Sequence, residues 1–238
     1  MDVSFTNIRL LVLDFDGVIV DSEGTKRTAW PMLFASVKDP QGFSWSEHDT
    51  ERLIEEAHVA WVYGTAKGSR YEIIEHIMDA VGYPKSKMMI DWYANGFDAL
   101  IQKAILERGV STEERGALET LASMLPLYLN SATPEEALKR SVETLGITSM
   151  FREVLGKTIE KRDRSKLENL AIAAGKESAR PDETLFIGDA ESDYRAAREF
   201  GAAFIRFAKF EYGRDKQWEQ KAPLVIKSLA GLVPLLQK

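Results

Sequence analysis

The sequence of 238 residues contains no cysteine. Disulfide bonds and thiolate chemistry are therefore excluded, and the absence fits a reducing compartment. No apolar run approaches the roughly 18 to 20 residues that cross a bilayer, and the first residues lack a basic flank leading into a long apolar segment. We therefore expect a cytoplasmic protein with no membrane partner.

The chain also has little excess charge of either sign. Its 31 basic and 37 acidic residues leave a net charge of -6, and no block of Lys and Arg is dense enough to follow a nucleic-acid backbone. We expect no nucleic-acid partner. The histidines His48, His58 and His76 lack the spacing of a metal-binding pair and are predicted to be ordinary helix residues.

The stretch at residues 10–18 stands out from this background. An apolar run of strand-forming residues ends in two carboxylates, Asp14 and Asp16, and Gly17 follows directly. A buried parallel strand has this pattern, and in open α/β sheets ligands bind beyond the carboxyl ends of the strands. Side chains two residues apart in a strand share a face, so both carboxylates can reach one reaction centre, and Gly17 allows close approach to a ligand. A strand that simply ends in a polar turn is the alternative.

A second predicted strand, residues 125–129, ends in the small polar residues Asn130 and Ser131. Thr133 and Glu136 have the spacing of a capping box, with a proline at the first position of the helix that follows. The free N–H groups at a helix start favour an anion, and Ser131 can donate a hydrogen bond to a phosphate oxygen. A well-capped helix without a ligand is the alternative.

A third predicted strand, residues 184–187, repeats the pattern of the first. A glycine follows the apolar run, then Asp189 and, one helical turn later, Asp193. Hard cations such as Mg²⁺ prefer carboxylate oxygens, so acids at neighbouring strand ends suit a magnesium site. A helix cap formed by Asp189 is the alternative.

The chain changes in character along its length. Residues 22–115 are rich in helix formers with apolar residues at helical spacing, which predicts an inserted helical domain. From residue 116 onward, helices alternate with short apolar strands, which implies a parallel sheet with helices on both faces. We predict an α/β fold with a doubly wound parallel sheet, in which residues 1–21 and 116–238 form the core and residues 22–115 the insert.

Together the three strand ends resemble the haloacid dehalogenase superfamily. The sequence DFDGV at residues 14–18 is similar to its first motif, Ser131 to its second, and Gly188 with Asp189 and Asp193 to its fourth. A helical insert directly after the first motif is similar to the branch that contains phosphoglycolate phosphatase and β-phosphoglucomutase. The resemblance implies a Rossmann-like core domain with an α-helical cap domain.

The third motif of the superfamily is a lysine near the start of the helix that precedes the fourth-motif strand. Lys166 matches it, since it follows the predicted cap residue Ser165 at a suitable distance before Asp189. Lys161 is the alternative, and the Lys-Pro pair usual in the family is absent.

The resemblance implies a Mg²⁺-dependent phosphatase that acts on a small phosphorylated metabolite, either a sugar phosphate or a phosphorylated organic acid, as a monomer or homodimer. Asp14 would form an aspartyl phosphate, and Asp16 would act as general acid and base. The implied metal ligands are Asp14, Asp16, Asp189 and Asp193. The implied phosphate-binding residues are Gly17, Asn130, Ser131 and Lys166.

Two alternatives to the phosphatase remain. Residues 18–30 resemble β-phosphoglucomutase, but Lys26 stands where the mutases carry a histidine, and Ser22 replaces their hinge threonine. A sugar phosphate mutase is therefore one alternative, and a non-catalytic binding protein that retains the fold is the other. Cleavage of a carbon–halogen bond is disfavoured, because dehalogenases of the superfamily lack an aspartate at the place of Asp16.

The insert contains a basic loop flanked by glycines. Its residues Lys67 and Arg70 are predicted to pair with an anionic group on the substrate. A solvated loop without contact to a ligand is the alternative.

Overall fold

The computed structural model describes residues 5–36, 48, 51–52, 70–80, 82–83, 85–158, 164–210, 222 and 224–237. The chain divides into two compact units. The described residues up to Asp21 and from Arg108 onward form the first unit, and those within Ser22–Glu107 form the second.

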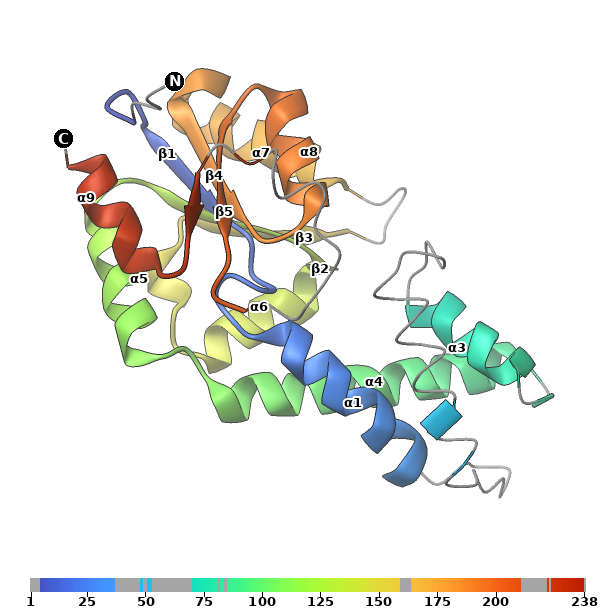
Figure 1. The fold of residues 1–238 in the computed structure, drawn as a ribbon. Helices are drawn as coiled ribbons and strands as arrows, with labels where there is room; N and C mark the ends of the chain where they lie inside the picture. The colour runs from blue at the N-terminus through green and yellow to red at the C-terminus, as the bar shows by residue number, and fades with distance from the viewer. Residues whose placement is uncertain are drawn as a thin grey trace. The chain divides into compact units, whose positions relative to one another are not determined.

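A six-stranded parallel sheet forms the centre of the first unit, in the order β3-β2-β1-β4-β5-β6 (Figure 1). The strands are β1 (Leu10–Leu13), β2 (Leu127–Pro134), β3 (Glu153–Lys157), β4 (Thr184–Gly188), β5 (Ala203–Phe207) and β6 (Val225–Ile226). This is the doubly wound order of Rossmann-like folds, and the direction of winding reverses between β1 and β4. The predicted α/β fold is confirmed.

Helices cover both faces of the sheet. Figure 1 shows α7 and α8 on one face and α5 and α6 on the other. The helices are α5 (Thr112–Met124), α6 (Glu135–Thr144), α7 (Lys166–Glu177), α8 (Glu191–Phe200) and α9 (Val233–Leu236), with 3-10 turns at Thr148–Met150, Pro181–Glu183 and Leu229–Leu232. Under α7 and α8 lies a buried apolar cluster that includes Leu10, Val12, Leu170 and Phe186. Alternate residues of β1 therefore anchor the strand whose end carries Asp14.

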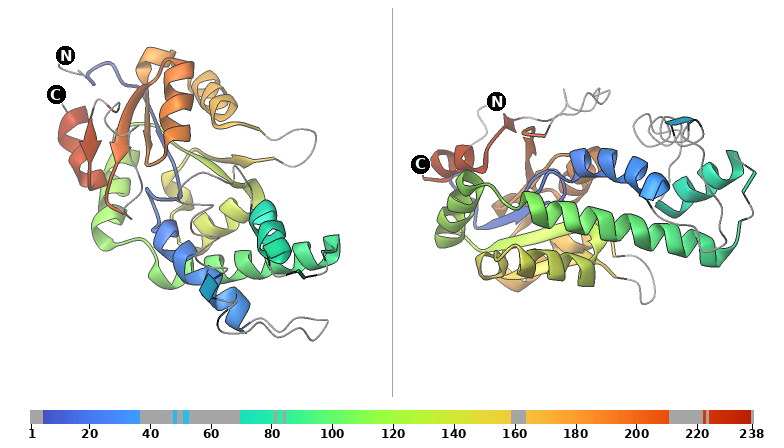
Figure 2. Two further views of the ribbon diagram at one scale, coloured as in Figure 1. Left: turned by 45° about the vertical axis from the view of Figure 1, so that its right-hand side comes forward. Right: turned by 90° about the horizontal axis from the view of Figure 1, so that it is seen from below.

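The described elements of the second unit are helices: α1 (Ser22–Ser36), α3 (Arg70–Ala80) and α4 (Lys87–Arg108), whose last residue belongs to the first unit (Figure 2). Trp30 of α1 stacks on Phe97 of α4 with ring centroids 3.8 Å apart. Tyr93 is fully buried, so it belongs to the core of this unit.

The first unit begins again at Arg108, whereas the insert predicted from the sequence extends to residue 115. The physical reason lies in the first turn of α5. Glu114 is only 2% exposed, accepts a hydrogen bond of 2.9 Å from the N–H of Leu229, and pairs with Lys209 at 2.6 Å. These contacts attach α5 to the core.

Strand β3 was not predicted from the sequence. This strand lies at the edge of the sheet, is five residues long, and contains Gly156, which weakens the apolar pattern. A Cβ at Gly156 would lie 2.4 Å from the Cα of Glu135, so close packing against α6 requires glycine.

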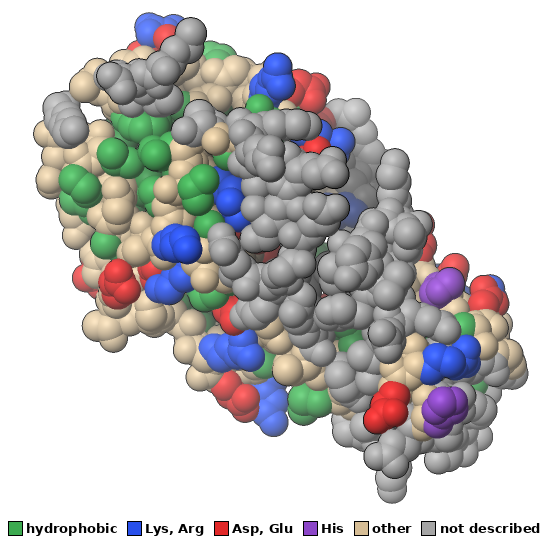
Figure 3. Space-filling model, in the orientation of Figure 1, with side chains coloured by type: hydrophobic (Ala, Val, Ile, Leu, Met, Phe, Trp, Pro, Cys, Tyr) green, Lys and Arg blue, Asp and Glu red, His purple; other side chains and the backbone are tan. Residues whose placement is uncertain are grey.

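The described surface is mixed in charge. On the face shown in Figure 3, lysine and arginine side chains lie beside aspartate and glutamate side chains. His48 and His76 are exposed, and His58 lies outside the described residues. None of the described helices has the length and apolar character that a membrane crossing needs.

Candidate active site

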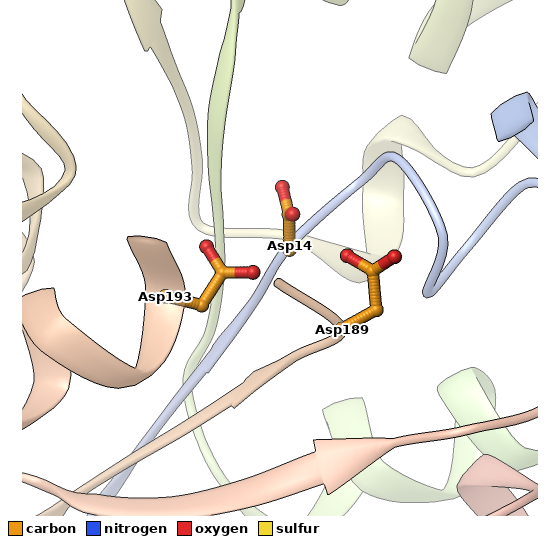
Figure 4. Close-up of side chains that lie close together, drawn as sticks. All are labelled: Asp14, Asp189 and Asp193. Carbon is orange, nitrogen blue, oxygen red and sulfur yellow. The ribbon is translucent and has the colours of Figure 1, made fainter. Parts of the chain in front are cut away.

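Two carboxylates meet where the winding of the sheet reverses. Asp14 directly follows β1 and Asp189 directly follows β4, and these strands are neighbours with Leu13 paired to Ile187. In doubly wound sheets, ligands bind beyond the carboxyl ends of the strands at this point. Figure 4 shows both side chains grouped with that of Asp193, which comes from the first turn of α8.

The three carboxylates form a compact oxygen cluster. Ligand oxygens of Asp14, Asp189 and Asp193 all lie within 4.8 Å of one another. Asp14 is 3% exposed and Asp193 is fully buried. Carboxylate oxygens this close together suit a hard divalent cation. The negative charge of the four carboxylates exceeds the single positive charge of Lys166; these carboxylates are Asp14, Asp16, Asp189 and Asp193. The residues present therefore fit Mg²⁺.

The environment of Asp14 disfavours its negative charge. Burial raises the pKa of Asp14 well above its usual range, and the charge of Asp193 raises it further, whereas the ammonium of Lys166 lowers it. A carboxylate in such surroundings loses hydration and gains like-charge repulsion. A nearby cation reverses both effects, so the cluster has a physical reason to bind one.

Lys166 lies directly against the cluster. Its Nζ is 2.8 Å from Oδ2 of Asp14 and also pairs with Oδ1 of Asp193. Burial lowers the pKa of Lys166, but the two carboxylates outweigh this effect and raise the pKa above its usual value, so the side chain stays charged. The position follows from the start of α7, where Ser165 and Glu168 form a complete capping box.

Asp16 accepts hydrogen bonds from two hydroxyl groups. Ser131 donates to Oδ2 of Asp16 at 3.2 Å, and Thr133 donates to the same oxygen at 2.8 Å. Ser131, which the sequence predicts to be the second motif, therefore lies next to Asp16 of the first motif. Thr133 was missed as a site residue, although a hydroxyl two residues after Ser131 at a strand end was a signal for it.

The predicted capping box of Thr133 and Glu136 is wrong. Strand β2 continues to Pro134, which is the N-cap of α6 and makes no side-chain capping bond. The hydroxyl of Thr133 is committed to Asp16 instead.

The haloacid dehalogenase-like hydrolase family matches residues 8–201, a range that contains all three strand ends and Lys166. The chain belongs to this family. The resemblance drawn from the motifs is confirmed.

Relatives cover nearly the whole length of this hydrolase. Phosphoglycolate phosphatase 1 of Pseudomonas aeruginosa is 27% identical over 95% of this chain and 79% of its own. A solved structure described as a predicted phosphoglycolate phosphatase from Haemophilus somnus has a TM-score of 0.71 at 17% identity, covering 97% of this chain and 98% of the other. The β-phosphoglucomutase of Clostridium difficile has a TM-score of 0.61 at 19% identity, covering 94% and 93%. At these identities the solved structures show a shared fold.

Two glycines of the hydrolase allow the carboxylates to gather. Gly17 has φ of 77°, and a Cβ there would lie 2.1 Å from Oδ2 of Asp189. A Cβ at Gly188 would lie 2.4 Å from Cβ of Asp193. Asp189 is not the helix cap, because the N-cap of α8 is Ala190, whose N–H donates to Oδ2 of Asp193 at 3.0 Å.

Asn130 of the hydrolase is fully buried beside Lys166. Its amide nitrogen donates to the backbone carbonyl of Lys166 at 2.8 Å, and its oxygen accepts from Asn169 at 2.9 Å. The predicted contact of Asn130 with phosphate stays a prediction. Asn169 was not singled out from the sequence, where it is one polar residue on a helix.

Several predicted residues fall outside the described part of this hydrolase. Lys67 and Lys161 lie outside the described residues. Arg70 is the first residue of α3, but its side chain is outside the description, as is that of Lys26.

Proposed function

We propose that this hydrolase removes phosphate from a small phosphomonoester, such as a sugar phosphate or a phosphorylated organic acid. The supporting observation is the pair of carboxylates after β1. Asp14 lies among cation-binding groups, while Asp16 is held by two hydroxyls, so the environments of the two residues suit different chemical roles.

In the first step, a carboxylate oxygen of Asp14 attacks phosphorus and forms a P–O bond as the ester P–O bond breaks. Asp16, protonated at this stage, gives its proton to the departing ester oxygen. The products are the alcohol and an aspartyl phosphate on Asp14.

In the second step, Asp16 acts as a base. A water molecule loses a proton to the Asp16 carboxylate and attacks phosphorus, and the P–O bond to Asp14 breaks. Inorganic phosphate leaves, and both carboxyl groups return to their starting states.

Other residues bind the phosphoryl group in this proposal. The ammonium of Lys166 and the hydroxyl of Ser131 hold phosphoryl oxygens, together with Gly17 and Asn130. A magnesium ion held by Asp14, Asp16, Asp189 and Asp193 would supply positive charge that offsets the repulsion between nucleophile and phosphate. In the same proposal the second unit is a cap domain, in which Lys67 and Arg70 pair with an anionic group of the substrate.

Phosphate release from a panel of phosphomonoesters tests the proposal. The wild type is compared with Asp14→Asn and Asp16→Ala, each with Mg²⁺ and with a chelator. Asp182→Asn is the matched control, because this carboxylate pairs with Arg180 on the exposed surface and has no place in the mechanism. Release that requires Mg²⁺, disappears in Asp14→Asn and persists in Asp182→Asn is the expected result.

Each of the other outcomes has a defined meaning. Isomerisation of a sugar phosphate without net phosphate release contradicts the hydrolysis and identifies a mutase. Absence of any turnover by the folded protein contradicts an enzymatic role and favours a binding protein.

A further inference from the structure

A buried pair of asparagines connects two strands to the start of α7. Asn169, in the first turn of that helix, donates through Nδ2 to Oδ1 of Asn130 at 2.9 Å and to the backbone carbonyl of Leu155 at 3.3 Å. Asn130 in turn donates through Nδ2 to the carbonyl of Lys166 at 2.8 Å. The relay therefore joins β3, β2 and the first residue of α7.

Stability alone does not explain this pair. Both side chains are fully buried. Burial of amides is costly unless each polar atom is bonded, and Oδ1 of Asn169 has no hydrogen-bond partner among the described residues. An apolar pair of similar volume avoids that cost, so the amides contribute directional contacts.

The hydrogen bonds of the two asparagines hold the backbone of Lys166, a residue of the site. The carbonyl that Asn130 holds belongs to Lys166, whose ammonium lies 2.8 Å from Asp14. A helix start that shifts or rotates carries this side chain with it. Because the relay bonds to both β2 and β3, a shift of the helix start would break hydrogen bonds to two strands.

We propose that Asn130 and Asn169 are positioning residues for Lys166: they hold the first turn of α7 so that its ammonium stays aimed at the cluster around Asp14. Asn169 has no contact with the substrate in the proposed function. The effect on catalysis rests on the proposed function, while the effect on the geometry of Lys166 does not.

A double-mutant cycle tests the catalytic part. Asn169→Leu is made in the wild type and in Lys166→Met, and kcat for phosphate release is measured for all four proteins. In the wild type we expect a fall of about tenfold to a hundredfold, as for a catalytic group displaced by about 1 Å. In Lys166→Met the same change should have little further effect, because the group it positions is gone. An equal fall in both backgrounds overturns the proposal.

Chemical modification tests the geometry without any turnover. In the wild type the Lys166 side chain is 12% exposed and Lys176 is 53% exposed. The acetylation rate of Lys166 relative to Lys176, measured by mass spectrometry, is expected to rise about tenfold in Asn169→Leu as charge-assisted bonds loosen. An unchanged ratio overturns the proposal even if the wild type hydrolyses no ester, so the two failures are distinguishable.

Two further variants serve as a control and as a milder substitution. Thr184→Val removes another fully buried side-chain donor, bonded to the carbonyl of Arg180 at 3.0 Å on the strand end opposite Asp189, and should leave the acetylation ratio unchanged. Asn169→Ser keeps a small donor and is used if Asn169→Leu does not fold. An intermediate acetylation ratio in Asn169→Ser is expected, and a wild-type ratio in both variants overturns the proposal.

Discussion

Replacement of Gly17 by alanine is expected to strain the backbone and to displace a carboxylate of the site, and a matched variant distinguishes the two effects. Gly17 has φ of 77°, and a Cβ there would lie 2.1 Å from Oδ2 of Asp189. The new methyl group therefore has two consequences, a strained backbone at residue 17 and a carboxylate that must move.

Gly146→Ala measures the strain by itself. Gly146 has φ of 66°, and a Cβ there would meet nothing within 4 Å. A left-handed conformation costs a residue with a Cβ roughly 1 to 2 kcal/mol. We expect both variants to lose about this much free energy of unfolding, because the end of the Asp189 side chain can rotate away from the methyl group at small cost.

The two variants should differ at the site. The Asp189 carboxylate has to retreat by about 1 Å in Gly17→Ala, and a misplacement of that size costs about a hundredfold in rate. Activity in Gly146→Ala should stay near the wild-type value. Calorimetric titration with Mg²⁺ should show weaker binding in Gly17→Ala only.

The assay combines urea unfolding, phosphate release and Mg²⁺ titration on the same preparations. Gly188→Ala adds a variant with a clash but no positive φ, since its Cβ would lie 2.4 Å from that of Asp193. If Gly17→Ala matched Gly146→Ala in activity and in Mg²⁺ affinity, the close approach of Gly17 to Asp189 would have no functional role, and the reasoning would be refuted.

Three further changes have expected outcomes. Thr133→Val removes the shorter hydrogen bond to Asp16 and should lower kcat about tenfold or more, since a hydrogen bond to a charged group contributes about 1.5–3 kcal/mol. Thr133→Ser keeps the hydroxyl and should keep most of the activity. Equal rates for the two variants would contradict a role of the Thr133 hydroxyl in holding Asp16. Lys209→Met leaves the buried carboxylate of Glu114, which is 2% exposed, without the lysine ammonium that pairs with it. We expect the free energy of unfolding to fall by about 2–3 kcal/mol, less than for a fully buried ion pair, because Lys209 is 27% exposed. Unchanged urea unfolding would contradict this prediction. Burial opposes ionisation of Glu135, but hydrogen bonds from a lysine and a backbone N–H and a nearby arginine lower its pKa below the usual 4.5. The ionised Glu135 carboxylate therefore stabilises the fold at pH values above 4.5, and this stabilisation is lost as the pH falls and the carboxylate becomes protonated. Between about pH 6 and pH 3, the free energy of unfolding of Glu135→Gln should therefore fall less steeply than that of the wild type.

Local patterns in the sequence predicted many elements closely. Apolar spacing predicts a strand at residues 203–207 and helices at residues 87–108 and 191–200, and β5, α4 and α8 have these bounds. Each of the two helices ends just before a glycine with positive φ, Gly109 or Gly201, so its end is encoded by a neighbouring residue. Strand β3 was missed because it is short and Gly156 interrupts its apolar pattern, so the local sequence does not mark a strand that pairs with β2 in the sheet.

The family and the polar residues at the carboxyl ends of β1, β2 and β4 can be read from the sequence, because a buried strand that runs into polar residues is a contiguous pattern. Which of these side chains meet depends on how the chain packs. Lys166 bonds with Asp14 across 152 residues, and Thr133 bonds with Asp16 across 117. The relay from Asn169 through Asn130 likewise exists only once β2, β3 and α7 have packed. Periodicity reports which face of an element is buried, whereas the partner of a buried polar group depends on how the sheet brings distant strand ends together.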